Sequence, residues 1–272
     1  MILFNYNNYK GMIIMDFINV TKENIISEHI CCSISSKKGD ICVETKKNWM
    51  LNRLEDGLVF RKANVRGKVF IEYIPCENAY VPIDGDGYMY IDCFWVSGKY
   101  KGMGYANELL NYCINDSKNK GKKGLVVLSS AKKMPFLSDP EYLKYKGFKV
   151  CDNAKPYFEL LYLPFEEYKD KPKFRQSAKN GYFKSEGVVL FYSHQCTHTE
   201  KYVKILEMVS KREKIPFKAI KIDTVESAKN APTPFTTYSI YINGKFITNE
   251  ILPEKKYLKI IDNTNLYREN NI

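Results

Sequence analysis

The connection over residues 95–110 carries the residues best suited to chemistry. It reads WVSGKYKGMGYANELL, with glycines at 102 and 104 directly before a run of helical periodicity. Glycine adopts positive φ and lets the backbone approach a ligand, while the first turn of a helix leaves N–H groups without intrahelical partners. Such a turn can bind a pyrophosphate. Glycines also occur in tight connections for purely steric reasons. The elements around the turn are therefore needed to distinguish a phosphate-binding turn from an ordinary tight connection.

A second candidate is Cys196, which lies between an apolar stretch and a helical one in GVVLFYSHQCTHTEKYV. Unpaired N–H groups and the helix dipole at such a position can lower the pKa of a thiol. We therefore expect a thiolate here, while an inert structural thiol is the alternative. His194 and His198 flank it, but the chain has only three scattered histidines, so we predict no metal site.

Two carboxylates stand inside apolar segments, Glu72 in KVFIEYIP and Asp92 in MYIDCFWV. A carboxylate in such surroundings is costly unless it is paired or functional. Asp92 lies at even spacing from Phe94 and Val96. Both acids are candidate general bases, with a water chain as the alternative.

The elements that must position these residues follow an α/β pattern in the first 165 residues. Alternation and turn signals predict helices near 22–34 and 43–55 and a helix over 105–119 that ends before Gly121. A short helix over 139–145 ends at Gly147. Strands are predicted at the following positions: 16–21, 57–65, 68–75, 85–98, 124–130 and 156–165.

Residues 166–186 are charged and aperiodic, which predicts a linker between a domain over 1–165 and a second one over 187–272. Within 1–165, residues 1–14 precede a second methionine, Met15, and are predicted to be an upstream extension. The second domain has a βαβ-like pattern followed by an Asn-Gly hairpin signal and a last helix. Its predicted elements are strands at 187–193, 216–223, 236–242 and 245–250 and helices at 200–213 and 253–261.

Composition narrows the class of protein. The chain has 272 residues, 44% of them apolar, which is enough to bury an ordinary core. Its eight cysteines form no CxxC pair and are expected to be reduced, mostly buried thiols. No apolar stretch would span a bilayer and no signal peptide is evident, so we predict a cytoplasmic protein without membrane contact. The net charge of +11 comes without a nucleic-acid recognition motif and favours a phosphate-rich small ligand over nucleic acid.

The glycine turn and the order of elements around it resemble the GNAT acetyltransferase family. The coenzyme A motif of that family is Gln or Arg, two residues, Gly, one residue, then Gly or Ala, and residues 101–106 match it with lysine in the first position. The resemblance covers residues 16–165. The second half resembles the thioredoxin-like fold, with CTHT where that fold carries CxxC, and the whole chain is similar to the YoaP-like acetyltransferases.

The resemblance implies an acetyl-CoA-dependent N-acetyltransferase in which an amine attacks the thioester directly. Trp95 and Val96 would bind the pantetheine arm, and Lys132 and Lys133 could reach the ribose phosphate, although solvated lysines are the simpler interpretation. The implied pyrophosphate site comprises Lys101, Gly102, Met103, Gly104, Tyr105 and Ala106. The resemblance leaves the acceptor open, because acceptor sites in the family are formed by variable loops; candidates are a small amine, an amino acid, an antibiotic and a protein N-terminus. Pairing of two chains through the first domain is common in the family.

The family usually places the acid, a tyrosine, four residues before the glycine of the KGF-like segment. That position is Leu143 here, with Tyr142 and Tyr145 nearby. We take Tyr142 as the candidate acid, against the alternative of an ordinary tyrosine. The alternative function for the whole chain is a coenzyme A-binding adaptor without turnover, in which Cys196 makes the chain redox-responsive.

Overall fold

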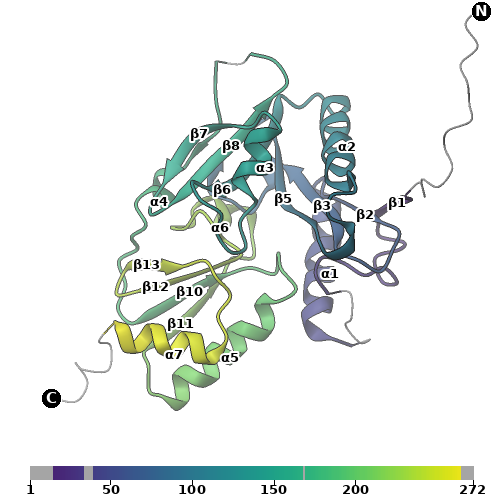
Figure 1. The fold of residues 1–272 in the computed structure, drawn as a ribbon. Coiled ribbons are helices and arrows are strands. Elements are labelled where there is room, and N and C mark those ends of the chain that lie inside the picture. The colour runs from purple at the N-terminus through teal and green to yellow at the C-terminus, as the bar shows by residue number, and fades with distance from the viewer. Residues whose placement is uncertain (1–14, 34–38, 168, 265–272) are drawn as a thin grey trace, which may run out of the picture.

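The computed structural model of the protein describes residues 15–33, 39–167 and 169–264. The predicted upstream extension over 1–14 lies outside these residues. Two main sheets stack on each other, and helices cover their outer faces (Figure 1). The fold class is the mixed α/β class expected from the sequence. No helix in the described ranges is long and apolar enough to cross a membrane.

The larger sheet has seven strands in the order β1-β2-β3-β5-β6-β8-β7. All neighbours are antiparallel except β5 and β6, which are parallel. Its strands are β1 (Phe17–Val20), β2 (Val59–Ala63), β3 (Val69–Pro75), β5 (Met89–Val96), β6 (Gly124–Ser130), β7 (Lys149–Ala154) and β8 (Phe158–Pro164). β6 is buried along its whole length, as expected of a continuous apolar run in the middle of a sheet.

Helices cover both faces of this sheet. Helix α1 (Ile41–Leu54) packs Trp49 and Met50 against one face, together with inward residues of β2 and β3. Helices α2 (Tyr105–Asn119) and α3 (Pro140–Tyr145) cover the other face through Leu109 and Leu143. Two single-turn helices, η1 (Cys76–Asn78) and η2 (Gly98–Tyr100), follow β3 and β5. Outside the bulge in β5, the side chains of the central strands alternate between these two cores.

The helix predicted near 22–34 is wrong in the described residues up to 33, which form turns instead. The side chain of Asn24 accepts a hydrogen bond from the Thr21 N–H and donates one to the Asn19 carbonyl. Such local side-chain bonds offer the backbone an alternative to the helix. The apolar spacing that suggested a helix is explained by the buried Ile25, whereas Ile26 is 83% exposed.

The second sheet has four strands in the order β11-β10-β12-β13, with only β10 and β11 parallel. Helices α5 (Thr199–Arg212) and α7 (Glu254–Asn263) cover its outer face. Its inner face packs against the α1 side of the large sheet, because Val189, Phe191 and Tyr241 belong to the same core as Trp49. The four strands of this sheet are β10 (Val188–Tyr192), β11 (Phe217–Lys221), β12 (Tyr238–Ile242) and β13 (Lys245–Thr248), and the short helix α6 (Val225–Lys229) follows β11.

The predicted linker contains the short strand β9 (Lys173–Phe174) and the single-turn helix α4 (Gln176–Lys179). β9 pairs with β4 (Ile83–Asp84), and Lys179 forms an ion pair with Asp152 on β7 at 2.8 Å. The segment is therefore packed against the larger sheet. Division of the chain into two domains at residues 166–186 remains our proposal.

Candidate active site

The glycine turn leads from η2 into α2 and adopts the backbone that the sequence suggested. Gly102 and Gly104 have φ of 76° and 84°, a region that favours glycine. A Cβ added at either position would meet nothing within 4 Å, so the space beside the backbone is open. Helix α2 has no side-chain cap at its N-terminus. The N–H of Asn107 donates to the Gly104 carbonyl, so the N–H groups of Tyr105 and Ala106, together with the helix dipole, are available to an anion.

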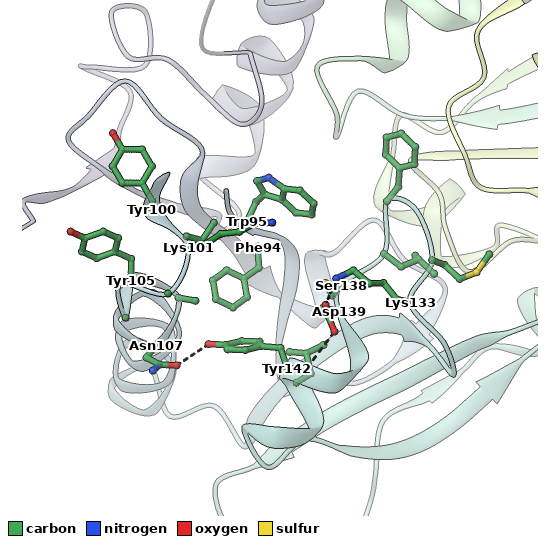
Figure 2. Close-up of a pocket in the computed structure, with 18 of the residues that line it drawn as sticks. Phe94, Trp95, Tyr100, Lys101, Tyr105, Asn107, Lys133, Ser138, Asp139 and Tyr142 are labelled. Atoms are coloured by element: carbon green, nitrogen blue, oxygen red, sulfur yellow. Dashed lines mark hydrogen bonds and ion pairs between the residues drawn. The ribbon is translucent and has the colours of Figure 1, made fainter. Parts of the chain in front are cut away.

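This turn opens onto a cavity of ≈ 760 Å³ (Figure 2), within the usual range for ligand pockets. Pairing between β5 and β6 ends at Ile91 and Val127, although β5 continues to Val96 and β6 to Ser130. The two strands separate beyond that point. The cavity is lined by residues of β5, the turn, α2, α3 and the loop after β6: 94–96, 100–102, 104–107, 133–139, 142 and 143.

The cavity collects most of the predicted pyrophosphate and pantetheine residues. Trp95, Val96, Lys101, Gly102, Gly104, Tyr105 and Ala106 line it. Met103 does not, and its side chain is exposed. Of the two candidate lysines, Lys133 lines the cavity and forms an ion pair with Asp139, whereas Lys132 does not line it.

Tyr142 points into the cavity from α3 (Figure 2), where its hydroxyl donates to Oδ1 of Asn107 at 3.2 Å. Its ring packs edge-on against Phe94 at 5.8 Å between centroids. Burial raises the pKa of Tyr142 to about 12, so the phenol keeps its proton at neutral pH. Leu143, at the family position of the acid, is buried in the core, and Tyr145 is 82% exposed and outside the cavity.

The two candidate bases lie on the opposite, α1 face of the sheet and do not line the cavity. In the register between β3 and β5, Glu72 pairs with Cys93 and Tyr73 with Ile91, so Asp92 is the extra residue of a β-bulge. The bulge breaks the alternation that would have placed Asp92 on the same face as Phe94 and Val96. Bulges of this kind re-aim side chains and are frequent beside active sites.

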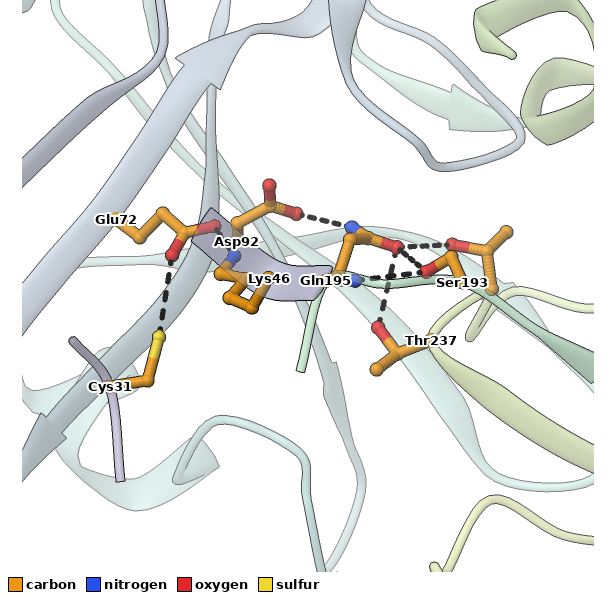
Figure 3. A network of polar contacts seen from close by, with 8 residues as sticks. Cys31, Lys46, Glu72, Asp92, Ser193, Gln195 and Thr237 are labelled. Atoms are coloured by element: carbon orange, nitrogen blue, oxygen red, sulfur yellow. Dashed lines mark hydrogen bonds and ion pairs between the residues drawn. The ribbon is translucent and has the colours of Figure 1, made fainter. Parts of the chain in front are cut away.

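Glu72 forms a buried ion pair with Lys46. Its Oε1 accepts from Lys46 Nζ at 2.5 Å, and the two side chains are 1% and 0% exposed (Figure 3). Its Oε2 accepts from the Cys31 thiol at 3.8 Å. Such a pair is strongly destabilised when one partner is lost. This arrangement favours a structural role for Glu72 over that of a base.

Asp92 is engaged on one oxygen only. Its Oδ1 accepts from Nε2 of Gln195 at 2.9 Å, whereas its buried Oδ2 has no hydrogen-bond partner. Burial raises the pKa of Asp92 to about 7, and the nearby Glu72 carboxylate contributes to the rise. The charges of Lys46 and Arg53 and the bond from Gln195 act in the opposite direction. A carboxyl that titrates near neutrality with a free oxygen is suited to accept a proton.

The thiolate expected at Cys196 is wrong. Burial raises the pKa of this thiol to about 11, which outweighs a backbone hydrogen bond at His198 that lowers it. Burial also lowers the pKa of His198, so the neighbouring ring supplies no cation at neutral pH. All eight cysteines are free and buried or half-buried. No group of three or more metal-ligating side chains occurs within the part of the chain that the structure describes.

Sequence reasoning missed the residues that surround Asp92, namely Lys46, Gln195 and the hydroxyls beside Gln195. Lys46 lies on a helix of mixed polarity, where a buried lysine gives no periodic signal. Gln195 stands next to the cysteine that drew attention to its loop, and 103 residues separate it from Asp92. The only usable signal was Asp92 itself, since a carboxylate inside an apolar strand requires a partner.

The sequence matches the models of two known families. Residues 26–134 match the model of the acetyltransferase (GNAT) family, and residues 216–259 match a second one described as YoaP-like. The first match places residues 26–134 in the class of GNAT acetyltransferases, and the second lies in the C-terminal part of the chain.

A relative that covers nearly the whole chain narrows this class. A Bacillus subtilis (strain 168) protein described as an uncharacterized N-acetyltransferase, YoaP, is 37% identical over 248 residues, which is 91% of this chain and 99% of the relative. The chain belongs to the family of YoaP-like GNAT N-acetyltransferases.

Solved structures of GNAT proteins are also similar to part of the chain. A paia N-acetyltransferase from Thermoplasma acidophilum, in complex with coenzyme A, is 16% identical with a TM-score of 0.37 over 56% of this chain and 100% of that chain. A GNAT acetyltransferase from Brucella melitensis, in complex with acetyl-CoA, is 13% identical with a TM-score of 0.35 over 60% of this chain and 94% of that chain.

Proposed function

We propose that this N-acetyltransferase uses acetyl-CoA as the donor and a primary amine as the acceptor. One observation carries the proposal: an uncapped helix N-terminus, preceded by two open glycines, borders a cavity that begins where β5 and β6 separate. The pyrophosphate would bind the N–H groups of residues 103–106, with Lys101 contributing charge. The pantetheine arm would follow the backbone of Trp95 and Val96.

The chemistry needs a base for the ammonium proton and an acid for the departing thiolate. We assign these roles to Asp92 and Tyr142, on opposite faces of the sheet at the separation of the strands. The amine nitrogen bonds to the thioester carbonyl carbon, and its proton passes through water to Asp92, which lies outside the cavity. The C–S bond then breaks with its electron pair on sulfur, and Tyr142 supplies the proton to the sulfur.

Donor binding is tested by calorimetric titration of acetyl-CoA into the wild type and a Gly104→Glu variant. The variant combines a strained backbone at φ 84° with a carboxylate that repels the pyrophosphate. Gly121→Glu is the matched control, because Gly121 also has positive φ and open space but lies at the other end of α2. We expect micromolar binding that is lost only in Gly104→Glu. A folded wild type without binding, or equal loss in both variants, would contradict the proposal.

The acceptor class is tested with acetyl-CoA and a panel of primary amines: a polyamine, the amino acids, an aminoglycoside and a peptide with a free N-terminus. Release of the free thiol of coenzyme A is followed for each amine. Amine-dependent release that disappears in Gly104→Glu supports acetyl transfer. Acetyl-CoA binding without release by any amine would instead support the coenzyme A-binding adaptor.

A further inference from the structure

The loop that follows β10, in the second half of the chain, contributes a side chain to the hydrogen-bond network around Asp92. Gln195, from this loop, is the residue that donates to Asp92 Oδ1 (Figure 3). No other hydrogen bond to the Asp92 carboxylate occurs within the described ranges, and its Oδ2 has none. The orientation of the candidate base therefore depends on a side chain from the other sheet.

The amide of Gln195 is fixed in one orientation. Its Oε1 accepts from Ser193 Oγ at 2.7 Å and from the Thr237 hydroxyl at 3.4 Å. The Thr236 hydroxyl lies 3.1 Å away but donates its proton to the Tyr80 carbonyl. Hydroxyls on the oxygen side direct the NH₂ group toward Asp92. Ser193 and Thr236 are buried, so these contacts are shielded from water. An amide held in this way acts as a preorganised donor.

The segments of the C-terminal half that neighbour this loop are anchored to the connection between β3 and β5. The Thr236 hydroxyl bonds to the Tyr80 carbonyl, and the Tyr80 hydroxyl donates to the Asp223 carbonyl at 2.6 Å. Lys229 donates to the carbonyls of Cys76 and Ile83 at 2.6 and 3.1 Å. These contacts join the loops at the ends of the second sheet to the segment between β3 and β5. The position of Gln195 relative to Asp92 is thus set by the fold.

We infer that Gln195 is a positioning residue for the base, and that the C-terminal half thereby completes the acetyl-transfer site; this rests on the proposed role of Asp92. Gln195 orients the carboxylate so that the other oxygen, Oδ2, keeps no competing hydrogen bond and can take up the proton. It also stabilises the ionised form through a hydrogen bond to the charged group. The C-terminal half is therefore part of the acetyltransferase machinery, and this contribution does not involve the Cys196 thiol.

Loss of the hydrogen bond from Gln195 should change the pKa of Asp92, and the groups around the carboxylate determine the direction. Glu72 on β3 faces it from one side, and Lys46 and Arg53 face it from α1. Tyr90 and Cys93, on the same strand, are further titratable neighbours, and both stay protonated because burial raises their pKa. Removing the amide donor leaves these groups in place. The carboxyl pKa then rises, because a hydrogen bond that favours the charged form is lost.

The test is a pH titration of the Asp92 side-chain carbon by ¹³C NMR on the full chain, with the signal assigned by its loss in Asp92→Asn. We expect Gln195→Met to raise the titration midpoint by about one pH unit, since a hydrogen bond to an ionised group and one pKa unit are of similar free energy. Gln176→Met, at an exposed glutamine on α4, is the matched control and should leave the midpoint unchanged.

With an amine that supports thiol release, the acidic limb of the rate profile should move by the same amount. From a midpoint near 7, this lowers the rate at pH 7 about fivefold, while the KM for acetyl-CoA is unchanged. A folded Gln195→Met protein with the wild-type midpoint overturns the inference. If that variant does not fold, Ser193→Ala should give a smaller shift in the same direction, and no shift there overturns it too.

These readouts separate the inference from the proposed function. The NMR midpoint reports the contact between Gln195 and Asp92 even if no amine supports thiol release. Conversely, full activity of Asp92→Asn would refute the role of Asp92 as the base and, with it, the positioning role, whatever the titration shows. A shifted midpoint together with an unshifted rate profile would also overturn the positioning role.

Discussion

The two faces of the larger sheet are built in opposite ways. The α2 face presents an open cavity whose lining comes from consecutive backbone segments, chiefly the glycine turn and the loop after β6. The α1 face buries a charged network whose members come from α1, β3, β5 and the loop after β10. A site formed by consecutive backbone can be identified from a short motif, whereas a network of distant side chains becomes visible only in the folded chain.

The largest expected effect tests the buried network of the α1 face. Lys46→Met leaves Glu72 buried without its partner, and we expect a loss of about 3–5 kcal/mol in the free energy of unfolding. Urea unfolding measures this loss. Lys144→Met, which breaks the more exposed pair with Glu159, is the control and should cost less than about 1 kcal/mol.

Restoring the balance of charge sharpens this prediction. Lys46→Met combined with Glu72→Leu should recover most of the lost stability, because no charge is then left buried without a partner. A Lys46→Met variant as stable as the wild type would contradict the prediction that breaking the buried ion pair on the α1 face destabilises the protein.

The next effect separates turnover from donor binding. Asp92→Asn removes the proposed base, so we expect kcat to fall about 100-fold. The Kd for acetyl-CoA should stay within about twofold, because Asp92 lies outside the cavity. Steady-state kinetics and calorimetry measure the two quantities, with Asp262→Asn at an exposed position on α7 as the control. If Asp92→Asn lost acetyl-CoA affinity by the same factor as kcat, the separation of donor binding on the α2 face from base catalysis on the α1 face would be wrong.

The same substitution should stabilise the protein at alkaline pH. The folded-state pKa of Asp92 is about 7, raised by burial from the ordinary 3.8. The contribution of this group to stability is complete below about pH 4 and is lost as the pH rises through 7. Between pH 5 and 8 we therefore expect Asp92→Asn to gain about 2 kcal/mol relative to the wild type. Urea unfolding at both pH values tests the sign, and a relative loss would contradict the raised pKa.

The smallest effect concerns the acid on the α2 face. Tyr142→Phe removes the hydroxyl proposed to protonate the thiolate, and we expect about a tenfold fall in kcat, at the low end for proton transfer because a thiolate is a modest base. Tyr145→Phe, on the same helix but exposed, is the control for the measurement. If both variants lose the same activity, α3 contributes only through packing.

Much of the fold could be predicted because the buried faces of its strands and helices are periodic. Strand β7 was missed, since it is an edge strand in which Lys149 and Val150 are exposed and no apolar alternation exists. The predicted first helix failed at Asn24, whose side chain bonds locally to the backbone. Each failure occurs where a local interaction or an edge position replaces the burial on which periodicity depends.

The candidate site was predictable in part: the glycine turn and Asp92 could be found from the sequence, whereas Gln195 could not. The glycine turn could be found because its chemistry comes from backbone groups in one short segment. Asp92 could be identified by its unfavourable surroundings, but the bulge that turns it toward α1 has no periodic signature. Gln195 could not be found, because its role arises from a contact with a residue 103 positions away.

The packing of the four-stranded sheet on the α1 face has a consequence for how the chain can evolve. Val189, Phe191 and Tyr241 share one apolar core with α1. Each half taken alone would therefore expose apolar side chains that are buried in the whole chain. Removal of either half by recombination would expose this core and favour aggregation. The two halves are therefore constrained to be inherited together, and substitutions at their contact must be compensated across it.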